Sequence, residues 1–130
     1  MKEKLAKLAL EARNNAYAPY SEFKVGAAIL CESGKIYTGA NVENVSYGLT
    51  NCAERSAIFS AASAGERKIC AIAIAGGKEA CDYTMPCGAC RQVLSEFADA
   101  ACPVYLAKSE TEIATYSLGD LLPYAFGGVK

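Results

Sequence analysis

Three cysteines and one glutamate, in two short segments, are the residues of this chain best suited to metal chemistry. Cys87 and Cys90 lie in P-C-G-A-C-R-Q, and Cys52 precedes Glu54 by two residues in N-C-A-E-R. Residues three apart share one face of a helix, so the sulfurs of Cys87 and Cys90 can converge on one ion. A third thiolate from Cys52 would leave the fourth position of tetrahedral Zn²⁺ open for water. The spacing therefore predicts a catalytic zinc site.

Glu54 is the predicted proton carrier of this site. Zinc lowers the pKa of bound water toward about 7, and a nearby carboxylate can pass the water's proton to a ring nitrogen and then to a leaving amine. Three thiolates leave a net negative charge on the site, which a hydrogen-bond donor must offset. Arg55 and Arg91 directly follow the two motifs, and we expect Arg55 to be the donor. The chemistry that this set supports is hydrolytic deamination by a zinc-bound hydroxide.

Composition narrows the class of protein further. The chain has no histidine, so acid–base chemistry and metal binding depend on other side chains. Its seven cysteines are an odd number, and the start of the chain does not have the pattern of a signal peptide, which indicates reduced thiols. The 13 Lys and Arg residues are scattered and balance 14 Asp and Glu, which disfavours a nucleic-acid partner. The longest apolar run, 70–75, is far below the roughly 20 residues of a membrane span. We therefore expect a soluble, cytoplasmic protein.

Hydrophobic periodicity predicts the elements that must position the two motifs. The predicted helices cover 2–16, 52–64 and 88–97, and residues 118–126 are predicted to form a short helix and an apolar tail. The predicted strands cover 23–31, 35–40, 70–75, 104–107 and 111–116. The first two strands form a hairpin, the third and fourth form a parallel β-α-β crossover, and the last returns antiparallel. Thr50 and Asn51 are expected to cap the second helix. The predicted fold is one α/β domain over residues 1–130, a three-layer α/β/α sandwich around a five-stranded mixed sheet.

Five segments resemble the small homotetrameric zinc-dependent cytidine deaminases, and together they span nearly the whole chain. They are A-Y-A-P-Y-S-E-F-K-V-G-A-A at 16–28, N-V-E-N at 41–44, C-A-E-R at 52–55, P-C-G-A-C-R-Q at 86–92 and L-L-P-Y-A-F at 121–126. C-A-E followed by P-C-x-x-C is similar to the zinc deaminase signature, with cysteine in place of its histidine. The resemblance implies a cytidine deaminase-like fold and hydrolysis of free cytidine, and of deoxycytidine, to the uridine product and ammonia in pyrimidine salvage.

The resemblance also implies how the nucleoside is held. Phe23 would contact the pyrimidine, and the backbone N–H of Ala53 would bind the base carbonyl. Asn41 and Glu43 would hold the ribose hydroxyls. A carboxylate in the pocket also repels phosphate, so we expect the substrate to lack a 5′ phosphate.

Two aromatic residues are implied to act across subunit interfaces. Phe126 matches the family aromatic that stacks on the base of a neighbouring subunit, and Tyr47 matches one that reaches toward the ribose. The implied assembly is a homotetramer whose active sites are completed by neighbouring subunits. Met85 and Val45 depart from the family pattern, and Met85 bears on the fine shape of the pocket.

Other interpretations remain open for the same residues. Within the class, the substrate could be a modified cytosine nucleoside such as blasticidin S. Outside it, C-x-x-C also occurs in structural zinc sites and redox pairs, which would make the chain a non-catalytic zinc or dithiol module. A structural site needs a fourth ligand, and Cys81 is the candidate. The remaining cysteines, Cys31, Cys70 and Cys102, are expected to pack in or beside the core.

Overall fold

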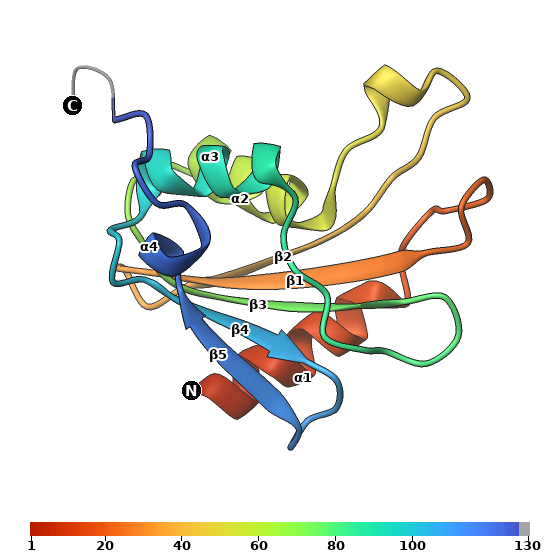
Figure 1. Cartoon of the computed structure of the whole chain (residues 1–130), viewed down its shortest axis with the longest axis horizontal. Coiled ribbons are helices and arrows are strands. Elements are labelled where there is room, and N and C mark those ends of the chain that lie inside the picture. The colour runs from red at the N-terminus through yellow and green to blue at the C-terminus, as the bar shows by residue number, and fades with distance from the viewer. Residues whose placement is uncertain (128–130) are drawn as a thin grey trace.

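A mixed sheet with helices on both faces forms the part of the chain that the structure describes, residues 1–127 of a computed structural model (Figure 1). Its elements, in chain order, are α1 (Lys2–Arg13), β1 (Lys24–Cys31), β2 (Ile36–Ala40), the 3-10 helix η1 (Tyr47–Leu49), α2 (Ala53–Ser63), β3 (Ile69–Gly77), α3 (Gly88–Phe97), β4 (Pro103–Ala107), β5 (Ile113–Ser117) and α4 (Leu118–Leu121). The sheet has five strands in the order β2-β1-β3-β4-β5. Only the β3–β4 pair is parallel, as the crossover predicts. The predicted fold class is confirmed.

The two faces of β3 explain the layers. Ile72 and Ile74 are buried in the core that contains α2 and α3, whereas Ala71, Ala73 and Ala75 are buried in the core that contains α1. Figure 1 shows α2 and α3 on one face of the sheet and α1 on the other. The small alanines let α1 lie close to β3, and the larger isoleucines fill the space below the two helices that carry the cysteine motifs.

Two predicted boundaries fail near the site. The first helix ends at Arg13 instead of residue 16, because Tyr17 leaves the helix to donate its backbone N–H to the carbonyl of Asn41. The third strand begins at Ile69 and continues through Gly77, because Gly76 and Gly77 still pair with β1. Glycines usually end a strand, but here the partner strand provides the hydrogen bonds that extend it.

The last strand begins later than predicted, whereas the short helix and the apolar tail after it are confirmed. The last strand begins at Ile113, because Glu112 accepts a turn hydrogen bond from Lys108 and donates its own backbone N–H to the Ser109 hydroxyl. The short helix predicted within 118–126 is α4, which ends at Leu121, and the predicted apolar tail follows it. Beyond it, Pro123 lacks a backbone donor and Tyr124 adopts a φ of 54°, which no α-helix contains. Residues 122–127 therefore form an apolar tail with a turn at 123–124.

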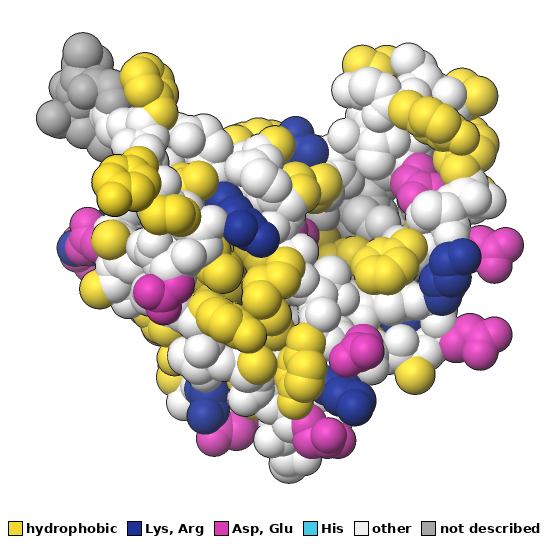
Figure 2. Space-filling model, viewed as in Figure 1, with side chains coloured by type: hydrophobic (Ala, Val, Ile, Leu, Met, Phe, Trp, Pro, Cys, Tyr) yellow, Lys and Arg dark blue, Asp and Glu magenta, His cyan; other side chains and the backbone are white. Residues whose placement is uncertain are grey.

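An arm projects from the sheet between β2 and α2 (Figure 1). Figure 2 shows hydrophobic side chains gathered on it, and its exposed apolar residues are Val42, Val45, Tyr47 and Leu49. Figure 2 also shows the surface hollowed between this arm and the body of the molecule. Within residues 1–127, no helix is long and apolar enough to cross a membrane.

Candidate metal centre and active-site cavity

The sulfurs of Cys52, Cys87 and Cys90 meet at one point between the starts of α2 and α3. Cys52 Sγ lies 3.8 Å from Cys87 Sγ, and Cys87 Sγ lies 3.2 Å from Cys90 Sγ. All three sulfurs lie within 4.8 Å of one another, and among the described residues no fourth Cys, Asp or Glu joins them. The predicted convergence of two separate motifs is confirmed.

Helix starts place two of these sulfurs. Cys52 is the N-cap of α2, with an extended backbone (φ -76°, ψ 157°), and Cys87 is the N-cap of α3 (φ -66°, ψ 165°). The predicted capping by Thr50 and Asn51 is wrong, because Asn51 pairs with Val42 at the base of the arm. The free N–H groups at a helix N-terminus carry partial positive charge, which favours a deprotonated sulfur at this end.

The three thiols and Arg55 form one electrostatic unit. Hydrogen bonding with Cys90 lowers the pKa of Cys52 to about 5, and Arg55 adds to this by donating from Nη2 to Cys52 Sγ at 3.1 Å. The same hydrogen bond raises the pKa of Cys90, because the Cys90 thiol donates its proton to the neighbouring Cys52 thiolate. The hydrogen bond to Cys52 also raises the pKa of Arg55. Arg55 therefore keeps its charge beside the sulfurs, in the position predicted for it.

This donor set fits Zn²⁺. Tetrahedral bonds of about 2.3 Å would separate two sulfurs by roughly 3.8 Å, close to the spacing of Cys52 and Cys87. Arg55 Nε is buried and has no hydrogen-bond partner among the described residues, so one donor of this cation is left unpaired. Thiolates produced by metal binding would balance it. Cys52, Cys87 and Cys90 are the residues that would hold the ion.

Glu54 lies two residues after Cys52, in the first turn of α2, and only 6% of its surface is exposed. Burial raises its pKa to about 6, and the negative charge of Cys52 adds to the effect. A carboxylate with this pKa exchanges protons readily near neutral pH. The structure therefore places a group suited to proton transfer beside the cysteine trio.

A cavity of about 200 Å³ opens onto this group. Its lining comes from β1, the strand ends and both helix starts, and consists of Phe23, Val25, Asn41, Thr50, Asn51, Cys52, Ala53, Glu54, Thr84, Met85 and Cys87. It thus brings together two of the three metal ligands, Glu54 and three of the predicted substrate contacts. Ala53 is the first residue of α2, so its backbone N–H has no acceptor within the helix.

Asn41 anchors the wall that carries Phe23. Its Oδ1 accepts from the backbone N–H of Val25 at 2.9 Å, and its Nδ2 donates to the carbonyl of Phe23 at 2.8 Å. The Oδ1 atom and the Nδ2 group can each make one more hydrogen bond, so Asn41 keeps one donor and one acceptor for a ligand. Asn41 therefore fixes the backbone of Phe23 and Val25 and also lines the cavity.

Glu43 and Tyr47 line an adjoining cavity of about 330 Å³ with Tyr20, Ser21 and Thr50. Thr50 lines both cavities, so the two are neighbours. Glu43 Oε1 accepts from the backbone N–H groups of Tyr20 (3.0 Å) and Ser21 (3.1 Å), and Oε2 accepts from the Ser21 hydroxyl. These bonds, that of the Ser21 hydroxyl above all, lower the pKa of Glu43. The carboxylate is charged at neutral pH, and Oε2 keeps one acceptor position.

Phe126 is not in either cavity. Its ring is 79% exposed on the C-terminal tail. Arg91, the other arginine considered for the sulfurs, instead donates to the carbonyls of Pro86 and Leu121. Cys81 packs against the α1 side of the sheet and is not part of the cysteine group, so its role as a fourth ligand is excluded.

Sequence reasoning missed several lining residues. Ser21, which binds the Glu43 carboxylate, lies inside the 16–28 segment that resembles the family, but a lone serine carries no signal of that contact. Thr84 lines the cavity and lies close against β3. A Cβ on Gly76 would lie 2.8 Å from the Thr84 hydroxyl. Of the other cysteines, Cys31 and Cys102 are buried as expected, but Cys70 is only partly so.

The fold and the cysteine trio together define a class. Residues 1–106 match the family model described as the cytidine and deoxycytidylate deaminase zinc-binding region, and the chain belongs to this family. A cytidine deaminase of Halalkalibacterium halodurans is 48% identical over 125 residues, which cover 96% of this chain and 93% of the relative. One of Mycobacterium tuberculosis is 44% identical over 119 residues, covering 92% and 84%.

Solved structures agree with these relatives. The crystal structure of cytidine deaminase from Burkholderia pseudomallei has 48% sequence identity and a TM-score of 0.88, and the match covers 97% of this chain and 99% of that one. The cytidine deaminase from Mycobacterium tuberculosis gives 44% identity and a TM-score of 0.83, with 95% of both chains covered. The zinc-binding description of the family agrees with the cysteine group found here.

Proposed function

We propose that the chain catalyses the hydrolytic deamination of free cytidine, and of deoxycytidine, to the uridine product and ammonia. The observation that carries this is the meeting of three sulfurs from two helix starts beside a buried carboxylate, in a cavity large enough for a flat ring. Relatives named cytidine deaminase at 43–48% identity support the substrate.

The proton chemistry falls to Glu54. When bound at the three cysteines, zinc lowers the pKa of a water molecule and prepares it for attack on the ring carbon that bears the amino group. Glu54 takes a proton from the attacking water, delivers it to the neighbouring ring nitrogen and then carries a proton to the departing amine. Its pKa of about 6 suits both directions of transfer. Arg55 offsets the negative charge of the sulfurs through its bond to Cys52.

Three residues of the cavity would orient the nucleoside. Phe23 supplies an apolar face for the pyrimidine, and the Ala53 backbone N–H donates to the base carbonyl. Asn41 uses its remaining donor and acceptor on the ribose. Because Asn41 also fixes Phe23, its loss should disturb base and sugar binding together.

Glu43 would select for a nucleoside without phosphate. The acceptor position left on Oε2 suits a sugar hydroxyl, and the lowered pKa of Glu43 keeps its charge, which repels a phosphate. Cytidine should therefore be a substrate and cytidine monophosphate a poor one. Equal turnover of the two by the unmodified protein would contradict this role.

The assembly and location are part of the same proposal. We infer one domain over residues 1–130, acting in the cytoplasm as a homotetramer in which Tyr47 and Phe126 reach neighbouring sites. The two residues are 77% and 79% exposed, Tyr47 on the arm between β2 and α2 and Phe126 on the C-terminal tail. On the arm, Tyr47 belongs to a group of exposed apolar residues with Val42, Val45 and Leu49, and exposed apolar patches favour a partner surface.

The decisive experiment is a spectrophotometric cytidine assay of the protein and of Glu54→Gln, with zinc measured on both. Glutamine keeps the shape of the side chain but cannot carry the proton, so we expect a loss of roughly 10²- to 10⁴-fold in rate with zinc retained. Glu96→Gln, an exposed carboxylate on α3, is the matched control. Full activity of Glu54→Gln, or no turnover by the unmodified protein, would reject the proposal. A non-catalytic zinc module would give one of these two results.

A further inference from the structure

Two consecutive side chains of the metal-binding helix α3 hold the C-terminal tail. Arg91 Nε donates to the Pro86 carbonyl at 2.8 Å, and Arg91 Nη1 donates to the Leu121 carbonyl at 2.8 Å. Gln92 Nε2 donates to the Phe126 carbonyl at 3.1 Å. Arg91 and Gln92 lie one helical turn after Cys87. Together they bind both ends of the segment from Leu121 to Phe126.

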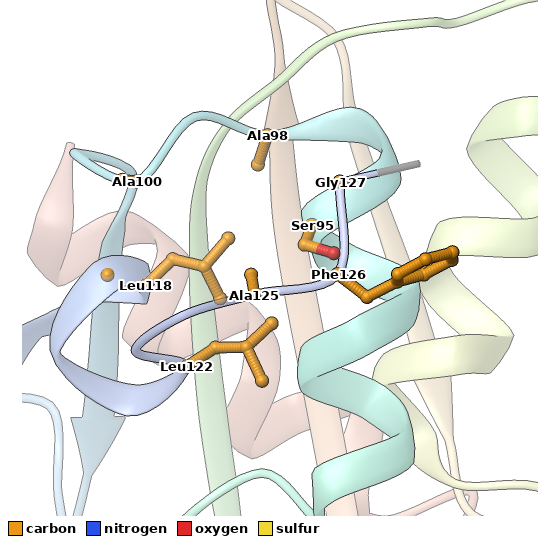
Figure 3. Close-up of a pocket in the computed structure, with 9 residues that line it drawn as sticks. Ser95, Ala98, Ala100, Leu118, Leu122, Ala125, Phe126 and Gly127 are labelled. Carbon is orange, nitrogen blue, oxygen red and sulfur yellow. The ribbon is translucent and has the colours of Figure 1, made fainter. Parts of the chain in front are cut away.

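Apolar packing does not account for the position of the tail beyond Leu122. Leu121 and Leu122 still pack against the core, but residues 123–127 are exposed. Below them lies a cavity of about 160 Å³, lined largely by small side chains, among them Ala98, Ala100 and Ala125. Figure 3 shows the Phe126 ring pointing away from this cavity, whereas Leu118 and Leu122 point toward it. The backbone around Phe126 is therefore held by the hydrogen bond from Gln92 and not by a packed interior.

The conformation of Tyr124 is a second, independent observation. Its φ of 54° lies in the left-handed region, which is costly for a bulky residue and persists only where its surroundings impose it. Tyr124 itself is fully exposed, so its own side chain does not impose it. Within residues 1–127, the side-chain hydrogen bonds that flank Tyr124 are those from Arg91 to Leu121 and from Gln92 to Phe126.

We infer that Arg91 and Gln92 are positioning residues that fix the Phe126 ring relative to the zinc-binding helix. The same arginine also donates to the carbonyl of Pro86, the residue before Cys87. One side chain therefore binds both the loop before Cys87 and the segment at Leu121. The role of Phe126 at a neighbouring active site rests on the proposed function above. The tether itself rests on the contacts within this chain.

A fluorescent reporter tests the tether without using activity. The chain has no tryptophan, so Phe126→Trp introduces a single one whose anisotropy reports the mobility of the tail. Removing one side-chain hydrogen bond lowers the equilibrium constant for the held state of the segment by roughly 2- to 10-fold. We expect lower anisotropy when Gln92→Ala or Arg91→Lys is added, since lysine lacks the planar fork that reaches two carbonyls. Glu96→Ala, on the same helix, is the control. Equal anisotropy in all four proteins would overturn the tether.

A double-mutant cycle tests whether the tether acts through Phe126. Gln92→Ala should raise KM for cytidine roughly 2- to 10-fold with little change in kcat and zinc content. In a Phe126→Ala background the same change should leave KM where it is. An equal increase in both backgrounds would show that Gln92 acts elsewhere and would overturn the inference. If the protein does not turn over cytidine at all, the proposed function fails, while the anisotropy result still decides the tether.

Discussion

The two helix starts that build the metal centre differ in how they meet their surroundings. At the start of α2, Ala53 is fully buried and Glu54 nearly so. At the start of α3, Cys87 and Gly88 are exposed. One helix begins inside the molecule, against β2, and the other begins at its surface. The enclosed start carries the carboxylate, where a low dielectric can raise its pKa, and the open start provides a ligand at the mouth of the cavity.

The arginines that follow the two motifs differ in the same way. Arg55 donates to a sulfur, whereas Arg91 donates to two backbone carbonyls. The arginine of the enclosed start thus lies at the sulfurs, and the arginine of the open start binds the loop before Cys87 and the end of α4. Similar sequence positions serve different purposes because their surroundings differ.

The largest expected effect is common to both starts. Cys52→Ser and Cys87→Ser each remove one of three ligands, and a hydroxyl is a poor replacement for a thiolate on zinc. We expect both variants to lose zinc and to fall to background activity, as measured by metal analysis and the cytidine assay. Cys81→Ser, a thiol on the other side of the sheet, should retain both. Stoichiometric zinc in either ligand variant would show that the two starts do not share one ion.

Arg55→Gln should separate the two arginines by their effect on rate. Removing the donor to Cys52 leaves the thiolate charge uncompensated, and loss of such a partner typically costs 10- to 100-fold in activity or metal affinity, so we expect a rate decrease of about this size. Zinc content should remain near that of the unmodified protein. Arg67→Gln, an exposed arginine bonded only to backbone carbonyls, is the control. An unchanged rate for Arg55→Gln would remove its electrostatic role.

The sequence predicts the layers, the strand pairing and the cysteine group, because these follow from strong signals. Apolar periodicity defined the elements, and C-A-E with P-C-x-x-C identified Cys52, Cys87 and Cys90 before any geometry was known. Arg55 could be preferred over Arg91 from the sequence. The true partners of Arg91 could not be foreseen, because one of them is the Leu121 carbonyl, thirty residues away in the chain.

Boundaries and local contacts were less predictable, for physical reasons. The strand over 69–77 passes through two glycines because β1 supplies partners, and the helix before Tyr17 ends early because a distant carbonyl competes for its N–H. At Gly88, no neighbour among the described residues requires a glycine, since a Cβ there would meet nothing within 4 Å. Such tertiary contacts leave no mark on local periodicity.

Gly39→Ala tests how tightly the α2 start is enclosed. A Cβ at Gly39 would lie 2.5 Å from the backbone N of Ala57 and 2.6 Å from the carbonyl O of Ala53, and neither backbone atom can move without shifting the helix. Overpacking of this kind typically costs about 1–3 kcal/mol. We expect the free energy of unfolding, measured by denaturant titration, to fall by that amount, with weaker zinc binding as Cys52 moves. A stability equal to that of the unmodified protein would mean that α2 is not pressed against β2.

Gly88→Ala is the matching change at the open start, and its expected effect is the smallest. Gly88 has no positive φ, and its side-chain position faces open space, so alanine fits without strain. Because alanine restricts the unfolded chain, we expect the free energy of unfolding to rise by about 0.4–1 kcal/mol, with kcat and KM unchanged. A clear loss of activity or zinc would show that a neighbouring surface closes on the start of α3 in the working assembly. The difference in exposure between the two helix starts would then hold only for the isolated chain and not for the assembly.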